Sequence, residues 1–168
     1  FIGVSNWTTQ RIEEANKFAE KNGMEPIRIS QINYSLAHSS VETFGDNTLV
    51  CMDTKEFRWY KKHDFPVMAF SPQAKGFFAK LAKGDAANNL PEGQYAGPAN
   101  LARLAKVKQL SEQTGDTPAK ITLGYLNSQP FFVSSVFAVT KLWQLDEDME
   151  AQDLTYDPKT VAFLENMI

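Results

Sequence analysis

The feature of this sequence that most constrains its fold is the alternation of short apolar segments with amphipathic helical stretches. The apolar segments are bounded by turn residues, and the second is rich in β-branched side chains, which favours strands. Strands that alternate with helices pair in parallel through right-handed crossovers. We therefore expect an α/β chain with four strands, at Phe1–Val4, Ile27–Tyr34, Pro66–Ser71 and Phe131–Val139.

Capping residues and apolar stripes indicate where the helices lie. Thr8 or Thr9 is suited to cap a first helix that stops at Asn22-Gly23, and Thr117-Pro118 opens another that reaches about Ser128. Further helices are expected over Lys55–Lys62, with Phe57 and Tyr60 inward, from Pro98 to Gly115, with a stripe of Leu101, Leu104, Val107 and Leu110, over Leu142–Ala151, and from Asp157 to Ile168. Ala37–Asp53 and Lys83–Gly97 show no clear period and are expected to be irregular.

Four strand–helix units make half of an eight-stranded parallel barrel, whose usual size is about 250 residues. An open four-stranded parallel sheet is the alternative. The chain begins inside an apolar run, Phe1-Ile2-Gly3-Val4. Because domain boundaries rarely fall inside a core element, we expect residues 1–168 to be one half-barrel unit and a fragment of a longer chain.

Composition narrows the class of partner. The formal net charge of −3 gives no electrostatic reason to expect nucleic acid or an anionic membrane. No apolar run approaches the roughly 20 residues that span a bilayer. The single cysteine, Cys51, has no partner for an internal disulfide or a thiolate metal site, and a small core residue is its expected role. We expect a cytoplasmic protein.

In a parallel barrel the active face lies at the carboxyl ends of the strands. Hydroxyl and amide side chains gather there, which suits hydrogen bonding to a neutral polar ligand, and Phe70 offers a stacking face. These edges carry no paired carboxylates, no histidine and no glycine-rich phosphate loop. The edge residues are Ser5 and Asn6, Gln31, Ser71 and Gln73, and Thr140 and Lys141.

Five motifs in sequence order resemble the aldo-keto reductase family, from its fifth to its eighth strand. They are Gly3-Val4-Ser5-Asn6-Trp7, Gln31-Ile32-Asn33-Tyr34-Ser35-Leu36, Ala69-Phe70-Ser71-Pro72, Thr117-Pro118-Ala119 through Ser128-Gln129-Pro130, and Thr140 to Asp148. The resemblance covers essentially the whole chain. It implies the C-terminal (βα)4 half of a (β/α)8 barrel and a nicotinamide cofactor.

The resemblance assigns roles at the nicotinamide end. Ser5 and Asn6 match the pair that binds the carboxamide, assisted by Gln31. Phe70 stands where the family usually stacks Tyr or Trp on the nicotinamide ring. Ser71 matches a pyrophosphate ligand, and Gln73 falls where a main-chain amide often serves.

The adenosine end departs from the family pattern. Thr140, Gln144, Glu147 and Asp148 match the segment that holds the adenine and the 2′-phosphate. Gln144 replaces the Arg of many members, as in the potassium-channel beta-subunit branch, and Asp148 replaces the usual Asn. A carboxylate near a phosphate is unfavourable. We expect NADP as cofactor, with NAD as the alternative.

The family's catalytic Tyr, Lys, Asp and His sit on strands before the point where this chain begins, so we expect no catalytic residue here. His38 is the only histidine near the active edge and is expected to be solvated. The expected function is the cofactor-binding half of an NAD(P)(H)-dependent reductase of aldehydes and ketones. The rival is a non-catalytic half-barrel that acts in assembly or regulation, and exposed sheet edges allow a homodimer in either case.

Overall fold

The described residues form one parallel sheet flanked by helices. The computed structural model describes residues 1–84 and 95–165. The strands lie side by side in sequence order, as β1 (Ile2–Ser5), β2 (Ile27–Asn33), β3 (Val67–Phe70) and β4 (Val133–Val136). Every pairing is parallel. The α/β architecture is confirmed, and it is consistent with part of a (β/α)8 barrel.

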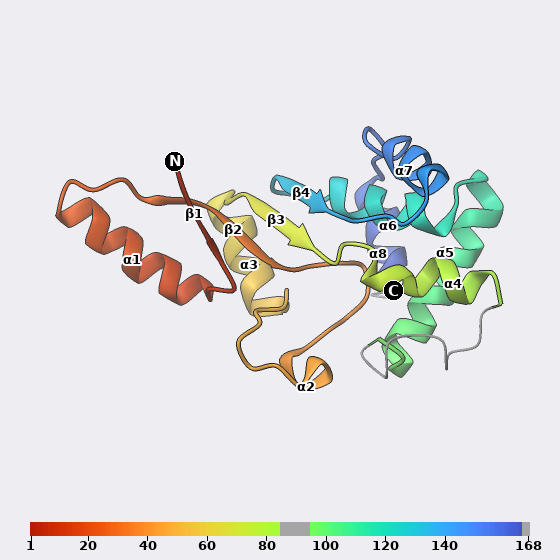
Figure 1. Ribbon diagram of the computed structural model, residues 1–168, viewed down its shortest axis with the longest axis horizontal. Coiled ribbons are helices and arrows are strands. Elements are labelled where there is room, and N and C mark those ends of the chain that lie inside the picture. The colour runs from red at the N-terminus through yellow and green to blue at the C-terminus, as the bar shows by residue number, and fades with distance from the viewer. Residues whose placement is uncertain (85–94, 166–168) are drawn as a thin grey trace.

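The six expected helices are present, and local capping explains where several of them begin. Thr8 caps α1 (Thr9–Lys21), Thr117 caps α6 (Pro118–Asn127) and Asp157 caps α8 (Pro158–Leu164), each through side-chain acceptance of a backbone N–H. The other long helices are α3 (Thr54–His63), α5 (Pro98–Thr114) and α7 (Leu142–Met149). Helices α5 to α8 gather at one end of the molecule and α1 lies at the other (Figure 1).

Two short helices were not predicted. The irregular segment 37–53 contains α2 (Val41–Phe44), capped by Ser40, and four residues are too few to display a helical period. The chain after β3 forms a 3-10 turn, η1 (Ala74–Gly76), and then α4 (Phe77–Ala82). Both Phe77 and Phe78 are buried, so α4 shows no narrow apolar stripe in the sequence.

Several expected details differ from the structure. Strand β4 spans Val133–Val136 and not the expected Phe131–Val139, and the Phe131 side chain packs among aromatic rings of the helical layer. Leu101 is 47% exposed and so does not belong to the buried stripe of α5. Helix α8 is described to Leu164, and the expected end at Ile168 lies outside the described residues, as does most of the expected loop 83–97.

The two faces of the sheet differ in burial. Strand register places Ser30 and Ile32 of β2 on one face with Val67 and Ala69 of β3, and all four are buried in the helical layer. On the opposite face most side chains are half-buried or exposed, among them Ser5, Gln31, Met68, Phe70 and Val136, although Asn33, in register with Phe70, is fully buried. This second face is the more accessible one.

Candidate functional site

The carboxyl ends of β1 and β2 bring three expected residues together. The hydroxyl of Ser5 donates to Oε1 of Gln31 at 3.2 Å. The backbone N–H of Asn6 donates to the Gln31 carbonyl at 2.9 Å. Ser5, Asn6 and Gln31 therefore form one polar group at the sheet edge, as the sequence predicted.

Asn6 also holds the segment that follows β2. Its Oδ1 accepts a hydrogen bond from the N–H of Val50 at 3.1 Å, and its φ of 55° lies in the left-handed region that Asn tolerates. This bond uses the carboxamide oxygen of Asn6 and not its side-chain N–H groups. The turn after β1 is thereby fixed against residues 44 positions away.

Phe70 lies at the end of β3 on the same face as Ser5 and Gln31. It pairs in register with Asn33 of β2 and Val136 of β4, and its side chain is half-buried. The accessible ring surface on this face is compatible with the expected stacking role. Polar groups and an aromatic ring thus share one edge and one face of the sheet.

The chain leaves β3 through a strained turn. Ser71, Ala74 and Lys75 have φ values of 52°, 50° and 55°, although none is glycine, and Gly76 follows at 80°. Such conformations cost about 1–3 kcal/mol each and cluster at ligand-binding turns. This turn carries Ser71 and Gln73, the two residues expected to approach the pyrophosphate.

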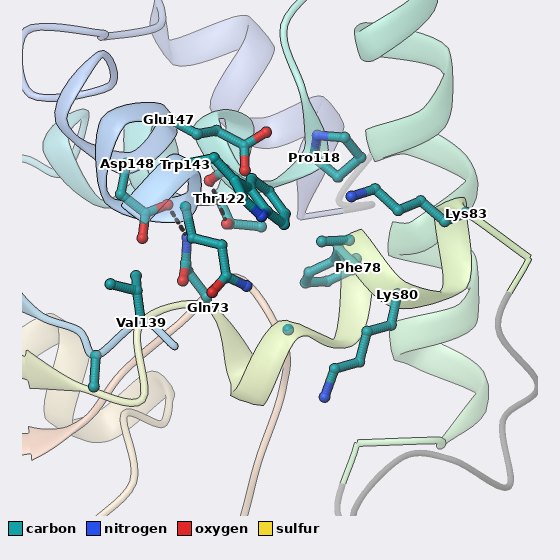
Figure 2. A pocket seen from close by; sticks show the side chains of 15 residues that line it. Gln73, Phe78, Lys80, Lys83, Pro118, Thr122, Val139, Trp143, Glu147 and Asp148 are labelled. Atoms are coloured by element: carbon teal, nitrogen blue, oxygen red, sulfur yellow. Dashed lines mark hydrogen bonds between the residues drawn. The ribbon is translucent and has the colours of Figure 1, made fainter. Parts of the chain in front are cut away.

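A cavity of about 200 Å³ lies beside that turn, between α4, α6 and α7 (Figure 2). Four of the residues expected to bind the cofactor line it, although more than 70 positions separate the first from the other three. They are Gln73, Gln144, Glu147 and Asp148. Thr140 is not among its lining residues, nor are Ser5, Asn6, Gln31, Phe70 and Ser71.

Gln73 and Asp148 are joined across this cavity. Nε2 of Gln73 donates to Oδ1 of Asp148 at 2.6 Å (Figure 2). Asp148 is only 4% exposed. Burial raises the pKa of the Asp148 carboxyl, the bond from Gln73 lowers it, and the charge of Glu147 raises it further. The cavity wall therefore contains a carboxyl group that is almost completely shielded from solvent.

Gln144 has a structural task that the sequence did not reveal. Its Oε1 accepts hydrogen bonds from the backbone N–H and the hydroxyl of Thr140, at 3.0 and 3.1 Å, and from the N–H of Lys141 at 3.0 Å. These bonds cap the N-terminus of α7. Thr140 and Gln144 are thus hydrogen-bonded chiefly to each other.

The cavity also contains residues that sequence reasoning did not select. Nζ of Lys83 lies 5.1 Å from the ring centroid of Trp143, and Nζ of Lys80 donates to the Lys75 carbonyl at 3.0 Å. The side chains of Lys80, Lys83 and Trp143 line the cavity. The sequence did not indicate that the two lysines lie at this site, because α4 was not predicted. Trp143 lies at the start of α7 and is 53% exposed.

The remaining candidates lie elsewhere. His38 is exposed, and its backbone N–H donates to Oδ1 of Asn100 at 2.7 Å, away from the cavity. Cys51 is buried, and burial raises the pKa of its thiol, which opposes reactivity. Within residues 1–84 and 95–165, no cluster of three or more His, Cys, Asp or Glu side chains is arranged to hold a metal ion. No helix in those ranges has the length and apolarity needed to cross a membrane.

Comparison with known proteins places this geometry in context. The model of the aldo/keto reductase family matches residues 1–168. Protein tas of Escherichia coli K12 is 22% identical over 167 residues, which cover 98% of this chain and 46% of that protein. Protein tas of Shigella flexneri matches to the same extent. The chain spans about half the length of these curated relatives.

Proposed function

Because the chain belongs to the aldo/keto reductase family, we propose that it provides the cofactor-binding part of an oxidoreductase that acts on aldehydes or ketones with NADP(H) or NAD(H). The residues of the proposed cofactor site are those of the two groups described above, at the strand edge and around the cavity. We propose the cytoplasm as its location and residues 1–168 as one half-barrel unit.

The observation that carries this proposal is the convergence of distant residues on one cavity. Gln73 comes from the β3–α4 turn, and Glu147 and Asp148 come from α7. The cavity combines an indole ring, two ammonium groups, two amides and two carboxylates. Aromatic surface suits a base, ammonium groups suit phosphates, and carboxylate oxygens accept from ribose hydroxyls or an amino group. This donor and acceptor set fits the adenosine end of a dinucleotide.

The strand-edge group supports the other end of the same ligand. Ser5, Asn6 and Gln31 offer hydroxyl and amide groups matched to a carboxamide, and Phe70 offers a ring on the same face. The Ser71 turn lies between the two groups along the chain. Together they hold an extended molecule whose ends differ in chemistry.

In this proposal the bound cofactor supplies the hydride, and the residues of this chain position it. Asn6 is fixed by its bond to Val50, and Gln31 by its strand pairing, so the donors are arranged before binding. Preorganised donors lower the entropic cost of ordering a ligand. Phe70 shields one face of the cofactor ring from water.

Nucleotide titration tests the proposal directly. We expect NADP⁺ or NAD⁺ to shift the backbone amide resonances of residues 70–76 and 138–148 in NMR spectra of the 168-residue chain. A few contacts of about 1–3 kcal/mol each, less the cost of ordering, correspond to a dissociation constant near the millimolar end. The amides of residues 18–21, at the end of α1 that lies away from Ser5 and Asn6, serve as the internal control (Figure 1). Unchanged amides at several millimolar of either nucleotide would count against the site.

The open sheet leads to an expectation about assembly. Within the described residues, β1 pairs only with β2 and β4 only with β3, and the accessible face includes Val136. Unpaired strand edges with apolar neighbours favour association. We expect a dimer or larger species of this chain by light scattering at tens of micromolar. A monomer at those concentrations would refute this expectation.

A further inference from the structure

A second cavity, of about 290 Å³, lies between the segment that follows β2 and helices α3, α5, α6 and α8. It shares no lining residue with the proposed cofactor site. Its volume is close to the lower end of the range of about 300–1,000 Å³ that ligand pockets occupy. Ala37, Met52 and Phe57 give its wall aliphatic and aromatic surface. In size and chemistry the cavity therefore suits a small molecule with an apolar part.

A positive charge at this cavity is fixed in place without a counter-ion. Arg103 of α5 lines the cavity, and its guanidinium donates from Nη1 to the Leu36 carbonyl at 2.6 Å and from Nε to the Glu165 carbonyl at 3.4 Å. Both acceptors are neutral main-chain groups. Among the residues that the structure describes, the guanidinium forms no ion pair. A planar guanidinium is the side-chain group best suited to bind a carboxylate.

A negative charge lies at the same cavity and is held apart from the guanidinium. Oε1 of Glu165, which also lines the cavity, accepts a hydrogen bond from the hydroxyl of Tyr125 at 2.6 Å. Tyr125 is only 4% exposed, and burial raises the pKa of its hydroxyl, so it remains a neutral donor. Arg103 and Glu165 therefore do not neutralise each other. Opposite charges that are held apart are complementary to a ligand with one charge of each sign.

We propose that this cavity binds a free α-amino acid with an apolar side chain, in its zwitterionic form. Arg103 binds the carboxylate, Glu165 binds the ammonium group, and the surface of Met52 and Phe57 receives the side chain. At neutral pH the carboxyl group of such a ligand is deprotonated and its amino group is protonated, so it carries both charges. The inference goes beyond the proposed function and does not depend on it.

The other charge at the cavity favours a zwitterion over a simple anion. Asp53 lines the cavity at an exposed position, where its Oδ1 caps α3 by accepting from the N–H of Glu56 at 2.7 Å. Because Asp53 and Glu165 outnumber Arg103, an excess of negative charge opposes a ligand that has only a carboxylate. A ligand that has only an ammonium group would leave the guanidinium without a counter-charge. A zwitterion avoids both costs.

The test compares three ligands of one carbon skeleton by NMR titration of the 168-residue chain. Leucine has both charges, its deaminated analogue isocaproate has only the carboxylate, and its decarboxylated analogue isoamylamine has only the ammonium group. The side-chain Nε–H signal of Arg103 reports occupation of the cavity. We expect leucine to shift this signal saturably at millimolar concentrations. Each analogue should bind at least about tenfold more weakly, because it lacks one charge-assisted contact.

Two substitutions assign the contacts. Glu165→Gln retains an oxygen to accept from Tyr125 and removes the charge, so it should weaken leucine and isoamylamine by about tenfold and leave isocaproate no weaker. Arg103→Gln should weaken leucine and isocaproate by a similar factor and leave isoamylamine no weaker. Lys106→Gln and Glu112→Gln are the matched controls, because they remove the same charges from α5 at positions that do not line the cavity. They should change the affinity for leucine by less than about twofold.

The pattern across ligands and variants decides the outcome. Leucine that binds no more tightly than either analogue, or that causes no saturable shift at several tens of millimolar, would overturn the inference. An affinity for leucine that Glu165→Gln leaves unchanged would do the same, and this variant retains the hydrogen bond to Tyr125 if Arg103→Gln fails to fold. Tightest binding of isocaproate would show a site for simple carboxylates and would also refute the zwitterion. The nucleotide titration is a separate measurement, so the proposed function stands or fails independently of this result.

Discussion

Replacement of Phe131 by alanine is expected to lower the free energy of unfolding by about 3–5 kcal/mol, the usual cost of removing a large aromatic side chain from a core. The side chain is 5% exposed. Its ring centroid lies 5.5 Å from that of Phe57, 5.8 Å from that of Tyr60 and 6.5 Å from that of Tyr34. Phe131 therefore joins the segment after β2, helix α3 and the start of β4, and its loss leaves a cavity where they meet.

The neighbouring residue provides a matched control. Phe132 is 63% exposed, and its backbone carbonyl, which a substitution retains, accepts the bond from the N–H of Val67. Phe132→Ala should therefore cost less than about 0.5 kcal/mol. Urea denaturation followed by circular dichroism measures both variants. Equal costs for the two substitutions would show that Phe131 does not occupy the core position described above.

The second large effect is the absence of turnover. With NADPH or NADH and a panel of aldehydes and ketones, we expect the 168-residue chain to oxidise no cofactor above the protein-free rate. Carbonyl reduction needs a positioned general acid, worth about 10²–10⁴ in rate. The side chains that lie at the strand edge are Ser5, Asn6, Gln31, Phe70 and Ser71, and none of them titrates near neutral pH.

Tyr34 follows β2 but does not supply that acid. Its ring lies in the helical layer, 6.3 Å from the ring of Tyr125, and burial raises the pKa of its hydroxyl far above the ordinary value. Absorbance at 340 nm measures cofactor oxidation. Turnover that survives stringent purification and disappears in Phe70→Ala would contradict the expectation, because it would place working chemistry at this strand edge.

Local sequence signals predicted the elements well where the physics is local. Thr8, Thr117 and Asp157 each cap a helix through a bond to a backbone N–H two or three residues away, so the start of the helix depends only on its own neighbours. The alternation of strands and helices likewise required parallel pairing. The edge group of Ser5, Asn6 and Gln31 follows from that pairing, because parallel strands end at a common edge.

Elements with a short or weak hydrophobic pattern were not predicted. Helix α4 has two adjacent buried phenylalanines and spans a single turn and a half, so it shows no period that distinguishes it from a strand or a loop. Consequently Lys80 and Lys83 could not be placed near Trp143. The sequence placed Phe131 in a strand, because the pattern of apolar residues does not show whether a residue next to a strand belongs to that strand or packs against the helices.

The sequence by itself determined the class of fold, the order of strands and helices along the chain, and the residues at the strand ends. These features depend on periodicity and capping, which act over a few residues. Only the tertiary structure decided which of those residues meet. The bond from Gln73 to Asp148 joins positions 75 residues apart, and the burial that leaves Oδ2 of Asp148 without a partner depends on how α4, α6 and α7 pack around it. Desolvation is a property of the surrounding atoms and not of the residue, so no local pattern can encode it.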